Sequence, residues 1–185
     1  MIYNLIICML FFFNFLKSED LIINYDNSYI EYKGFHILHN WSARTHSFES
    51  NINCKNYKAL NNNGYDDCLF YINTNVELFD SKNENRDSNM FDVVEGYLYP
   101  QVSFKSIDFI SESTTKARVN GLLFFHGIEK ELDINIEFNL SDNKLLSSAI
   151  FFINLDEYNI DLPSLLLFPI ENKIEIEVHL EGEFK

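Results

Sequence analysis

The strongest constraint on the fold is a strict alternation of apolar and polar residues in two stretches of the chain. Residues 131–140 read ELDINIEFNL, so every second side chain is apolar and the intervening ones are acids or amides. Residues 174–180 repeat the pattern. Successive side chains of a β-strand point to opposite faces, whereas a helix would scatter these residues around its circumference. Both stretches are therefore predicted to be strands with one buried and one hydrated face.

Further strands are predicted elsewhere in the chain, in segments with a similar apolar content. Turn-forming residues separate several of them, including His126-Gly127 and the Asn-rich residues 61–64. Many strands joined by short turns are typical of an antiparallel sandwich or barrel. Residues 19–185 show no internal repeat and no shift of composition, which predicts one domain over this range. The additional strands are expected at about residues 28–39, 46–54, 68–79, 101–110, 116–125 and 145–155.

One segment departs from the strand pattern. Residues 85–96 read NRDSNMFDVVEG, and their apolar side chains fall at helical spacing. Asp87 or Ser88 can cap a helix, and Gly96 can end it. Pro100 follows, and proline does not continue a helix. The segment predicts a short helix between two strands that covers an edge or one mouth of a barrel.

The chain begins with an apolar run, MIYNLIICMLFFFNFL, over residues 1–16. A membrane-spanning helix needs about 20 such residues, and the run is closer in length to the hydrophobic region of a signal peptide. We predict a signal peptide over residues 1–18, with an uncleaved membrane anchor as the alternative. Cleavage would leave residues 19–185 without stable membrane insertion, as a periplasmic or secreted protein.

The chain is acidic, with 28 Asp and Glu residues against 14 Lys and Arg residues and a net charge of −14. Such a surface repels phosphate, and the few Lys and Arg residues are scattered among acids, so a nucleic-acid partner is not expected. Many of the acids, such as Glu131 and Glu175, occupy the polar positions of the alternating strands. The charge is therefore predicted to coat the outside of the sheet.

The cysteines are consistent with export. Cys8 lies in the predicted signal peptide, which leaves Cys54 and Cys68 in the mature chain. An even pair in an oxidising compartment is a disulfide candidate, and closing a loop of this size contributes about 3 kcal/mol. Two unrelated thiols are the alternative.

No motif for catalysis or for metal binding is apparent. His36 and His39 are three residues apart in a strand pattern, which sends their rings to opposite faces. The sequence holds no G-x-S-x-G, no H-E-x-x-H and no glycine-rich phosphate loop. We therefore predict no metal, no cofactor and no enzymatic activity.

The apolar residues of the predicted strands are the stronger functional signal. A barrel of about eight strands is either filled by its own side chains or holds one small ligand, and an apolar lining suits a lipid. The pattern alone leaves both interiors open. The residues predicted to face the interior and to bind a ligand there are Phe104, Leu122, Phe124, Ile134, Ile136, Phe138, Ile150, Phe152, Ile176 and Val178.

Ordered motifs run through the second half of the chain. Residues 80–106 contain S-x-N-x-x-R-D and then Y-P-x-V-x-F-x-S, and residues 120–130 read NGLLFFHGIEK. In this order they resemble the YceI-like family of lipid- and polyisoprenoid-binding proteins, and the resemblance covers most of residues 28–185. The chain departs from that family where Asn154 replaces a common Arg. The matching positions are Ser81, Asn83, Arg86, Asp87, Tyr99, Pro100, Phe104, Ser106, Gly121, Leu123, His126, Gly127 and Lys130.

The resemblance implies an all-β protein, a lipocalin-like eight-stranded antiparallel β-barrel with one short helix. It implies an exported protein that holds a lipid or polyisoprenoid chain in an apolar interior, as a carrier or a store. Arg86 and Asp87 would then form an ion pair or cap at the helix, or contact a headgroup at the mouth. Two alternatives remain: a filled barrel that acts as an interaction scaffold in a stress response, and a hydrolase or isomerase on the same barrel.

Overall fold

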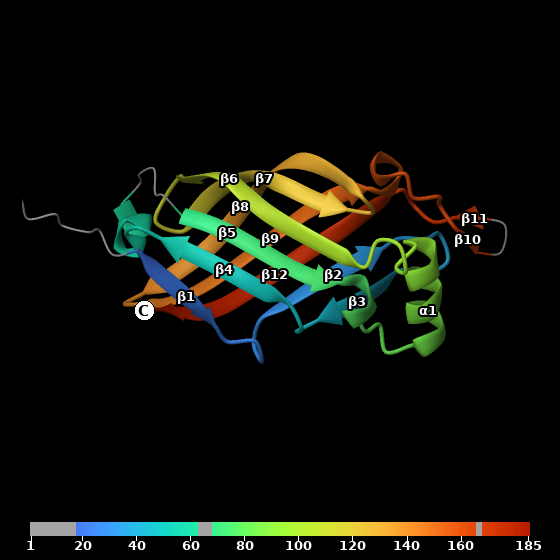
Figure 1. Cartoon of the computed structure of the whole chain (residues 1–185), viewed down its shortest axis with the longest axis horizontal. Helices are drawn as coiled ribbons and strands as arrows, with labels where there is room; N and C mark the ends of the chain where they lie inside the picture. The colour runs from blue at the N-terminus through green and yellow to red at the C-terminus, as the bar shows by residue number, and fades with distance from the viewer. Residues whose placement is uncertain (1–17, 63–67, 166–167) are drawn as a thin grey trace, which may run out of the picture.

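The computed structural model describes residues 18–62, 68–165 and 168–185, and the predicted signal peptide lies outside them except for Ser18. The described chain is dominated by strands (Figure 1). The strands are β1 (Glu19–Ile23), β2 (Tyr29–Gly34), β3 (Trp41–Thr45), β4 (Glu49–Cys54), β5 (Cys68–Asn75), β6 (Gln101–Ser111), β7 (Lys116–Phe125), β8 (Ile128–Ser141), β9 (Lys144–Asn154), β10 (Ser164–Leu165), β11 (Phe168–Pro169) and β12 (Lys173–Phe184). The helices are α1 (Glu84–Val93) and the 3₁₀ turns η1 (Tyr57–Asn62), η2 (Val76–Leu78) and η3 (Leu155–Tyr158).

Eight strands close into an antiparallel barrel in the order β1-β4-β5-β6-β7-β8-β9-β12, and β12 pairs back to β1. β12 is long enough to pair with two strands along one edge. Its residues Gly182–Phe184 pair with β1, and its residues Glu175–His179 pair with β2. β3 then extends the sheet from β2. The predicted all-β, eight-stranded barrel with one short helix is confirmed.

The boundaries differ from the prediction near the N-terminus. The expected strand at 28–39 ends at Gly34, and the chain turns back into β3 at Trp41. β1 was not predicted, because five residues give too short a window for a periodic pattern. At β12, by contrast, the alternation over 174–180 runs through the middle of the strand as expected.

One end of the barrel is closed by η1. The ring of Tyr57 stacks on Phe184 at a centroid distance of 4.5 Å, and the hydroxyl of Ser111 donates a hydrogen bond of 3.0 Å to the carbonyl oxygen of Leu60. A disulfide between Cys54 and Cys68 joins β4 to β5 at this end. The disulfide and the packing contacts of η1 therefore lie at the same, closed end of the barrel.

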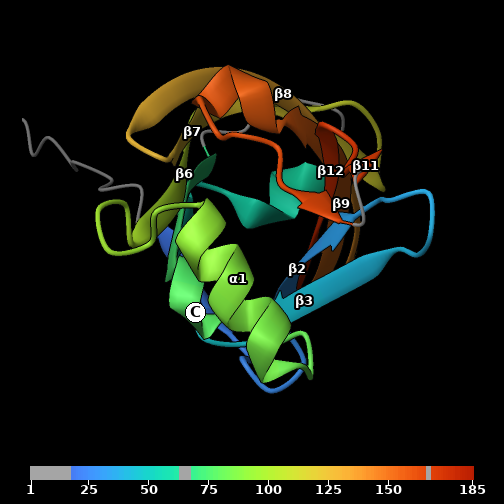
Figure 2. The same cartoon turned by 90° about the vertical axis from the view of Figure 1, so that its right-hand side faces the viewer.

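At the opposite end, α1 lies across the barrel (Figure 2). The side chain of Asn83 caps the helix by accepting a hydrogen bond of 3.1 Å from the backbone N–H of Arg86. The predicted helix is confirmed, but its cap is Asn83 and not Asp87 or Ser88. Asp87 instead accepts a hydrogen bond of 3.1 Å from the backbone N–H of Ser81, which fixes the segment leading into the helix.

The buried apolar side chains form two clusters. The larger one includes Ile52, Phe109 and Phe184 and lies toward η1, and the smaller one includes Leu123, Ile153 and Tyr158. Tyr32, Met90, Phe104 and Ile176 are partly buried and pack against both clusters.

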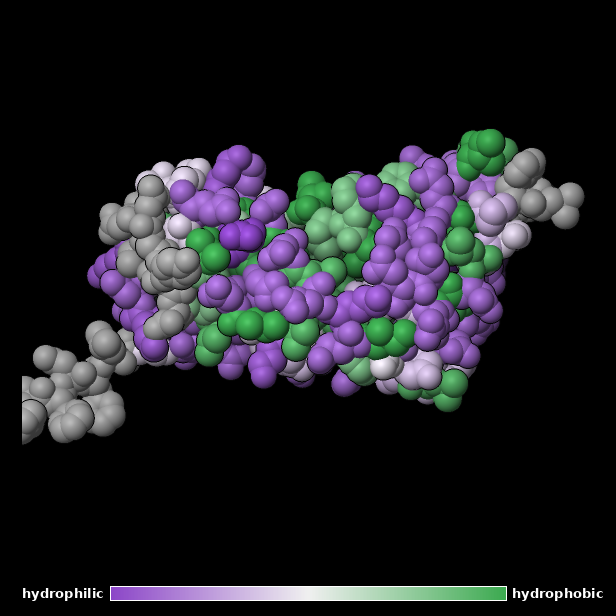
Figure 3. All heavy atoms as spheres, turned by 90° about the horizontal axis from the view of Figure 1, so that it is seen from above, coloured by the Kyte–Doolittle hydropathy of each residue, from purple (hydrophilic) through white to green (hydrophobic). Residues whose placement is uncertain are grey.

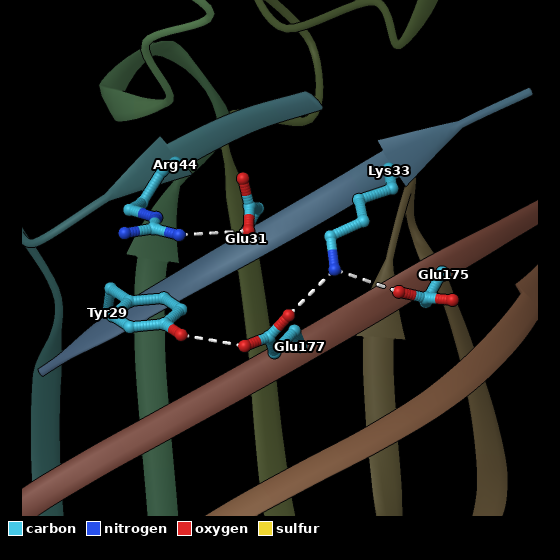
Figure 4. Close-up of polar contacts among 6 residues, drawn as sticks. All are labelled: Tyr29, Glu31, Lys33, Arg44, Glu175 and Glu177. Carbon is cyan, nitrogen blue, oxygen red and sulfur yellow. Dashed lines mark hydrogen bonds and ion pairs between the residues drawn. The ribbon is translucent and has the colours of Figure 1, made fainter. Parts of the chain in front are cut away.

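An ion-pair network on the outer face ties β2 and β3 to β12 (Figure 4). Lys33 Nζ lies 3.0 Å from Glu175 and 2.7 Å from Glu177, and the hydroxyl of Tyr29 donates a hydrogen bond of 2.6 Å to Glu177. Arg44 pairs with Glu31 at 3.1 Å, and its guanidinium lies 3.8 Å from the centre of the Tyr29 ring. These contacts hold the β2–β3 hairpin against the barrel wall.

Candidate functional site

A cavity of about 860 Å³ lies inside the barrel and extends from α1 to Leu60 of η1. Small-molecule sites have volumes of about 300–1,000 Å³, so this one is large enough for an extended ligand. Its walls are formed by side chains from β2 to β9 and from β12. The barrel is therefore hollow and is not filled by its own side chains.

The apolar lining follows from the alternation in the sequence. On β12 the residues Ile174, Ile176, Val178 and Leu180 all line the cavity, while Glu175 and Glu177 point outward into the ion-pair network. Every second residue of a strand faces the same side, so the periodic sequence produces a continuous apolar wall.

Six of the ten residues predicted to face the interior do so. They come from β6, β8 and β12, which are strands with a clear alternation over at least part of their length. The six are Phe104, Ile134, Ile136, Phe138, Ile176 and Val178.

The prediction that Leu122, Phe124, Ile150 and Phe152 face the interior is wrong. The last three are exposed on the outside by 39%, 56% and 44%, and the cavity is lined instead by the residues next to them in sequence. β7 ends in LLFF and β9 contains AIFFI, so apolar residues occupy both faces of these strands. The alternation that would show which face is buried is therefore absent from these runs. The replacements are Leu123, Phe125, Phe151 and Ile153.

A signal for the correct orientation was present at the other end of each strand. On β7, Lys116 and Arg118 are outward, and counting in steps of two from them places Leu122 and Phe124 outside as well. On β9, Lys144 gives the same result for Ile150 and Phe152. The exposed Phe152 ring is covered by Lys173, whose Nζ lies 3.7 Å from the ring centre.

The face of the molecule in Figure 3 is mostly hydrophilic, with apolar residues scattered among the polar ones.

Polar lining residues are concentrated at the α1 end. Arg86 and Asn89 lie one turn apart on the helix, and the apolar Met90 and Val93 follow on the same side. Helical residues three and four apart share a face, so α1 presents a mixed polar and apolar surface to the cavity. Of the residues in this segment, the family resemblance predicts a place near the mouth only for Arg86 and Asp87. The polar lining residues of α1 and its cap are Asn83, Asn85, Arg86, Asn89 and Asp92.

Tyr32 of β2 also lines the cavity, and its hydroxyl is buried without a hydrogen-bond partner among the described residues. Burial is the main cause that raises the pKa of Tyr32 well above its ordinary value, and the Asp87 carboxylate adds to the effect. Buried hydroxyl groups normally have partners, so this one is a donor available for a hydrogen bond.

His126 connects the chain beyond α1 to the barrel. Its Nδ1 lies 2.7 Å from the carbonyl oxygen of Tyr158, and its Nε2 lies 2.9 Å from a carboxylate oxygen of Glu95. Both ring nitrogens thus face oxygen acceptors, and both bonds are satisfied at once when the ring is an imidazolium. His126 has a positive φ of 50° in the β7–β8 turn, so the predicted turn at His126-Gly127 is observed.

In the described part of the chain, no group of three or more His, Cys, Asp or Glu side chains is arranged to hold a metal ion. The helices described are all too short or too polar to cross a membrane.

A known protein family and several solved structures share this architecture. A family model described as the YceI-like domain matches residues 22–182. The crystal structure of BcnA from Burkholderia cenocepacia is similar with a TM-score of 0.73 and 13% identity, covering 86% of this chain and 99% of that chain. A polyisoprenoid-binding domain from Saccharophagus degradans, implicated in plant cell wall breakdown, has a TM-score of 0.64 and 12% identity, covering 90% of this chain and 98% of that chain.

The YceI protein of Campylobacter jejuni is similar with a TM-score of 0.62 and 14% identity, covering 75% of this chain and 82% of that chain. At these identities the solved structures show a shared fold. No curated protein matches the chain in sequence.

Proposed function

Because the chain belongs to the YceI-like domain family, whose model matches residues 22–182, we propose that it binds a lipid or polyisoprenoid chain inside its barrel. The observation that carries this proposal is the cavity of about 860 Å³ with its apolar walls. A similar fold is described as polyisoprenoid-binding in the protein from Saccharophagus degradans, which is consistent with such a ligand.

The affinity would come from burial of the chain. Each CH₂ group removed from water contributes about 0.8 kcal/mol, so a five-carbon isoprene unit contributes about 4 kcal/mol before the cost of ordering the ligand. Affinity should therefore rise with chain length until the cavity is full. The shape of the lining then sets which chains fit.

Binding without catalysis is the second part of the proposal. Among the described residues, four ionisable side chains line the cavity, and all belong to α1, β2 or the loop before β3: His39, Arg86, Asp92 and Tyr32. General acid–base catalysis needs such groups close to the reacting atoms, and the deeper lining is apolar except for hydroxyl groups such as those of Thr74 and Ser147. We therefore propose a binding protein that requires no cofactor.

We further propose that residues 1–18 direct export and that residues 19–185 act in the periplasm or outside the cell, as a carrier or a store. The disulfide between Cys54 and Cys68 supports this location, since disulfides persist in oxidising compartments.

The test is extraction of the purified protein with organic solvent, together with native mass spectrometry. We expect a co-purifying chain-like lipid, and rebinding of a fluorescent prenyl probe after delipidation. Absence of both would overturn the binding proposal and favour the scaffold alternative, in which the barrel acts through its surface.

A matched pair of variants connects binding to the cavity. Ala149 lines the cavity and Ile150 next to it faces outward, with 56% of its surface exposed. Ala149→Phe would fill part of the cavity and weaken probe binding at least about 10-fold, roughly the loss of two buried CH₂ groups. Ile150→Phe adds the same ring outside and should leave binding unchanged.

A further inference from the structure

Two loops at the α1 end of the barrel carry strongly exposed apolar side chains. Among the described side chains, the large hydrophobic ones with the greatest exposure are Tyr97 at 85%, Ile37 at 76% and Leu98 at 69%, and Leu38 is exposed beside Ile37. Ile37 and Leu38 belong to the loop between β2 and β3, and Tyr97 and Leu98 follow α1 (Figure 2). We call these four residues the apolar tips.

The first of these loops is held in a fixed shape. His36 is buried, and its Nδ1 accepts a hydrogen bond of 3.2 Å from the backbone N–H of Leu38. The carbonyl oxygen of Phe35 accepts another of 2.9 Å from the backbone N–H of Glu171. These contacts bury one residue of the loop and leave the next two in water. The exposure of Ile37 and Leu38 is therefore a property of an ordered loop.

The turn after α1 is also held by several contacts. The carbonyl oxygen of Glu95 accepts hydrogen bonds of 2.8 Å and 2.9 Å from the backbone N–H groups of Leu98 and Tyr99. The ring of Tyr97 packs edge-on against Phe91 of α1, at a centroid distance of 4.7 Å. Both loops thus hold apolar side chains in water at defined positions. Such exposed apolar groups mark a surface that meets a partner.

The apolar tips lie beside the mouth of the cavity. His39, which follows Leu38 in sequence, lines the cavity, and so does Val94 at the end of α1, shortly before Tyr97. The four tip residues themselves are outside the lining of the described structure. A molecule that enters or leaves the cavity at the α1 end therefore passes close to the tips.

The arrangement of the tips fits a bilayer better than a protein partner. The two loops lie on opposite sides of α1, so their apolar side chains do not form one continuous patch (Figure 2). A stable protein interface buries a continuous surface of about 1,200–2,000 Å² in total. A bilayer, in contrast, accepts separate apolar side chains at its surface, and tyrosine is enriched there.

We propose that the apolar tips insert into the surface of a lipid bilayer and place the mouth of the cavity against it, so that the ligand passes directly between membrane and barrel. This proposal rests on the proposed function, because a lipid ligand is what makes a bilayer the partner. Asp92 and Glu95 are exposed acids beside the tips. They repel anionic headgroups, so the bilayer surface is expected to be zwitterionic.

The experiment measures binding of the delipidated protein to phosphatidylcholine vesicles by flotation. The double variant Ile37→Asn/Leu98→Asn should bind at least about 10-fold more weakly than wild type, because two apolar side chains no longer leave water. Addition of anionic phosphatidylglycerol to the vesicles should weaken the binding of the wild-type protein. Thermal unfolding of each variant checks that it is folded.

A matched control changes the same two residue types on the barrel wall. Leu69 of β5 and Ile107 of β6 are exposed by 61% and 55%, and they lie on strands away from the mouth loops. Leu69→Asn/Ile107→Asn should therefore bind vesicles as wild type does. An equal loss of binding in this control would overturn the proposal, since the whole apolar surface would then act.

Hydrogen exchange of the vesicle-bound protein identifies the end of the barrel that meets the bilayer. Residues 1–16 are an apolar run and would bind vesicles wherever they are retained. They lead into β1, where Glu19 pairs with Cys54 at the end closed by η1. Docking by the tips should slow exchange in residues 35–40 and 95–99. Slower exchange at the closed end alone would overturn the proposal.

The outcomes separate this proposal from the proposed function. Ile37 and Leu98 lie outside the cavity lining, so their double variant should bind the fluorescent prenyl probe in solution as tightly as wild type. Wild-type protein that binds the probe but no vesicles would overturn the docking proposal and leave the proposed function intact. Equal vesicle binding by wild type and the tip variant would also overturn it. Failure of the wild-type protein to bind the probe would instead contradict the proposed function.

Discussion

Nε2 of His126 lies 2.9 Å from a carboxylate oxygen of Glu95, and this contact joins the turn between β7 and β8 to the chain just after α1. The other ring nitrogen contacts the carbonyl oxygen of Tyr158, at the end of η3. One imidazole therefore links three segments around the mouth of the cavity. It anchors the chain that leaves α1 to the barrel.

His126→Ala should destabilise the protein by about 1–3 kcal/mol, because a buried ring is removed and the Tyr158 carbonyl loses its donor. Glu95→Gln should cost less than about 1 kcal/mol, since the Glu95 side chain is 52% exposed and its ion pair is screened by solvent. Urea unfolding of both single variants and of the double variant measures the coupling. A His126→Ala cost no larger than that of Glu95→Gln would contradict this role.

The orientation of β7 predicts different costs for two adjacent leucines. Leu123 is buried and lines the cavity, so Leu123→Ala should lower the free energy of unfolding by about 2–3 kcal/mol. Leu122→Ala, on the outer side of the same strand, should cost less than about 1 kcal/mol. Chemical denaturation of the two variants under the same conditions makes the comparison. Equal costs, or a larger cost for Leu122→Ala, would contradict this orientation of β7.

The disulfide should be important for stability. Reduction, or the double substitution Cys54→Ser and Cys68→Ser, should lower the free energy of unfolding by about 3 kcal/mol, because the unfolded chain gains freedom when the loop opens. Thermal and urea unfolding with and without a reductant test this. The double serine variant should be insensitive to the reductant, which serves as the control.

The ion-pair network on β2 and β12 should respond to pH at both extremes. The hydrogen bond from Lys33, followed by that from Tyr29, lowers the pKa of Glu177 below its ordinary value of about 4.5. The stabilisation is therefore complete above that value and is lost as the pH falls through the lower pKa of the folded protein. Hydrogen bonds to Glu177 and Glu175 raise the pKa of Lys33 above its ordinary value of about 10.5, so its contribution is lost as the pH rises beyond that value.

The network is measured by comparing Glu177→Gln with wild type. We expect the variant to lose about 1 kcal/mol at neutral pH and to show a shallower fall of stability with acid. Unfolding experiments between pH 3 and 7 give both quantities. An unchanged acid slope would show that other carboxylates account for the acid sensitivity.

The barrel and its helix could be predicted from the sequence where a pattern was long and one-sided. β8 and β12 alternate strictly over several residues, and the apolar residues of α1 lie at helical spacing. The orientation of β7 and β9 could not be read from the apolar runs at their ends, since apolar residues occupy both faces there. Their charged residues hold that information, at positions several residues away.

The closure of the barrel and the position of Tyr32 beside α1 depend on distant parts of the chain. β1 pairs with β12, so the first and last strands of the barrel meet only in the folded state. Tyr32 approaches α1 because β2 pairs with the first half of β12. No local pattern specifies such pairings. In the same way, the sequence predicted an ion pair between Arg86 and Asp87, whereas Asp87 accepts a hydrogen bond from the backbone N–H of Ser81 and no such ion pair is found among the described residues.

The hollow interior has a consequence for the amount of this protein in a cell. Its two apolar clusters face a space that the chain does not fill, so a bound ligand would serve as a removable part of the core. A ligand that binds only the folded state stabilises it by an amount that grows with ligand concentration. When the ligand is scarce, more chains would unfold and be degraded, so the abundance of the protein would follow the supply of its ligand.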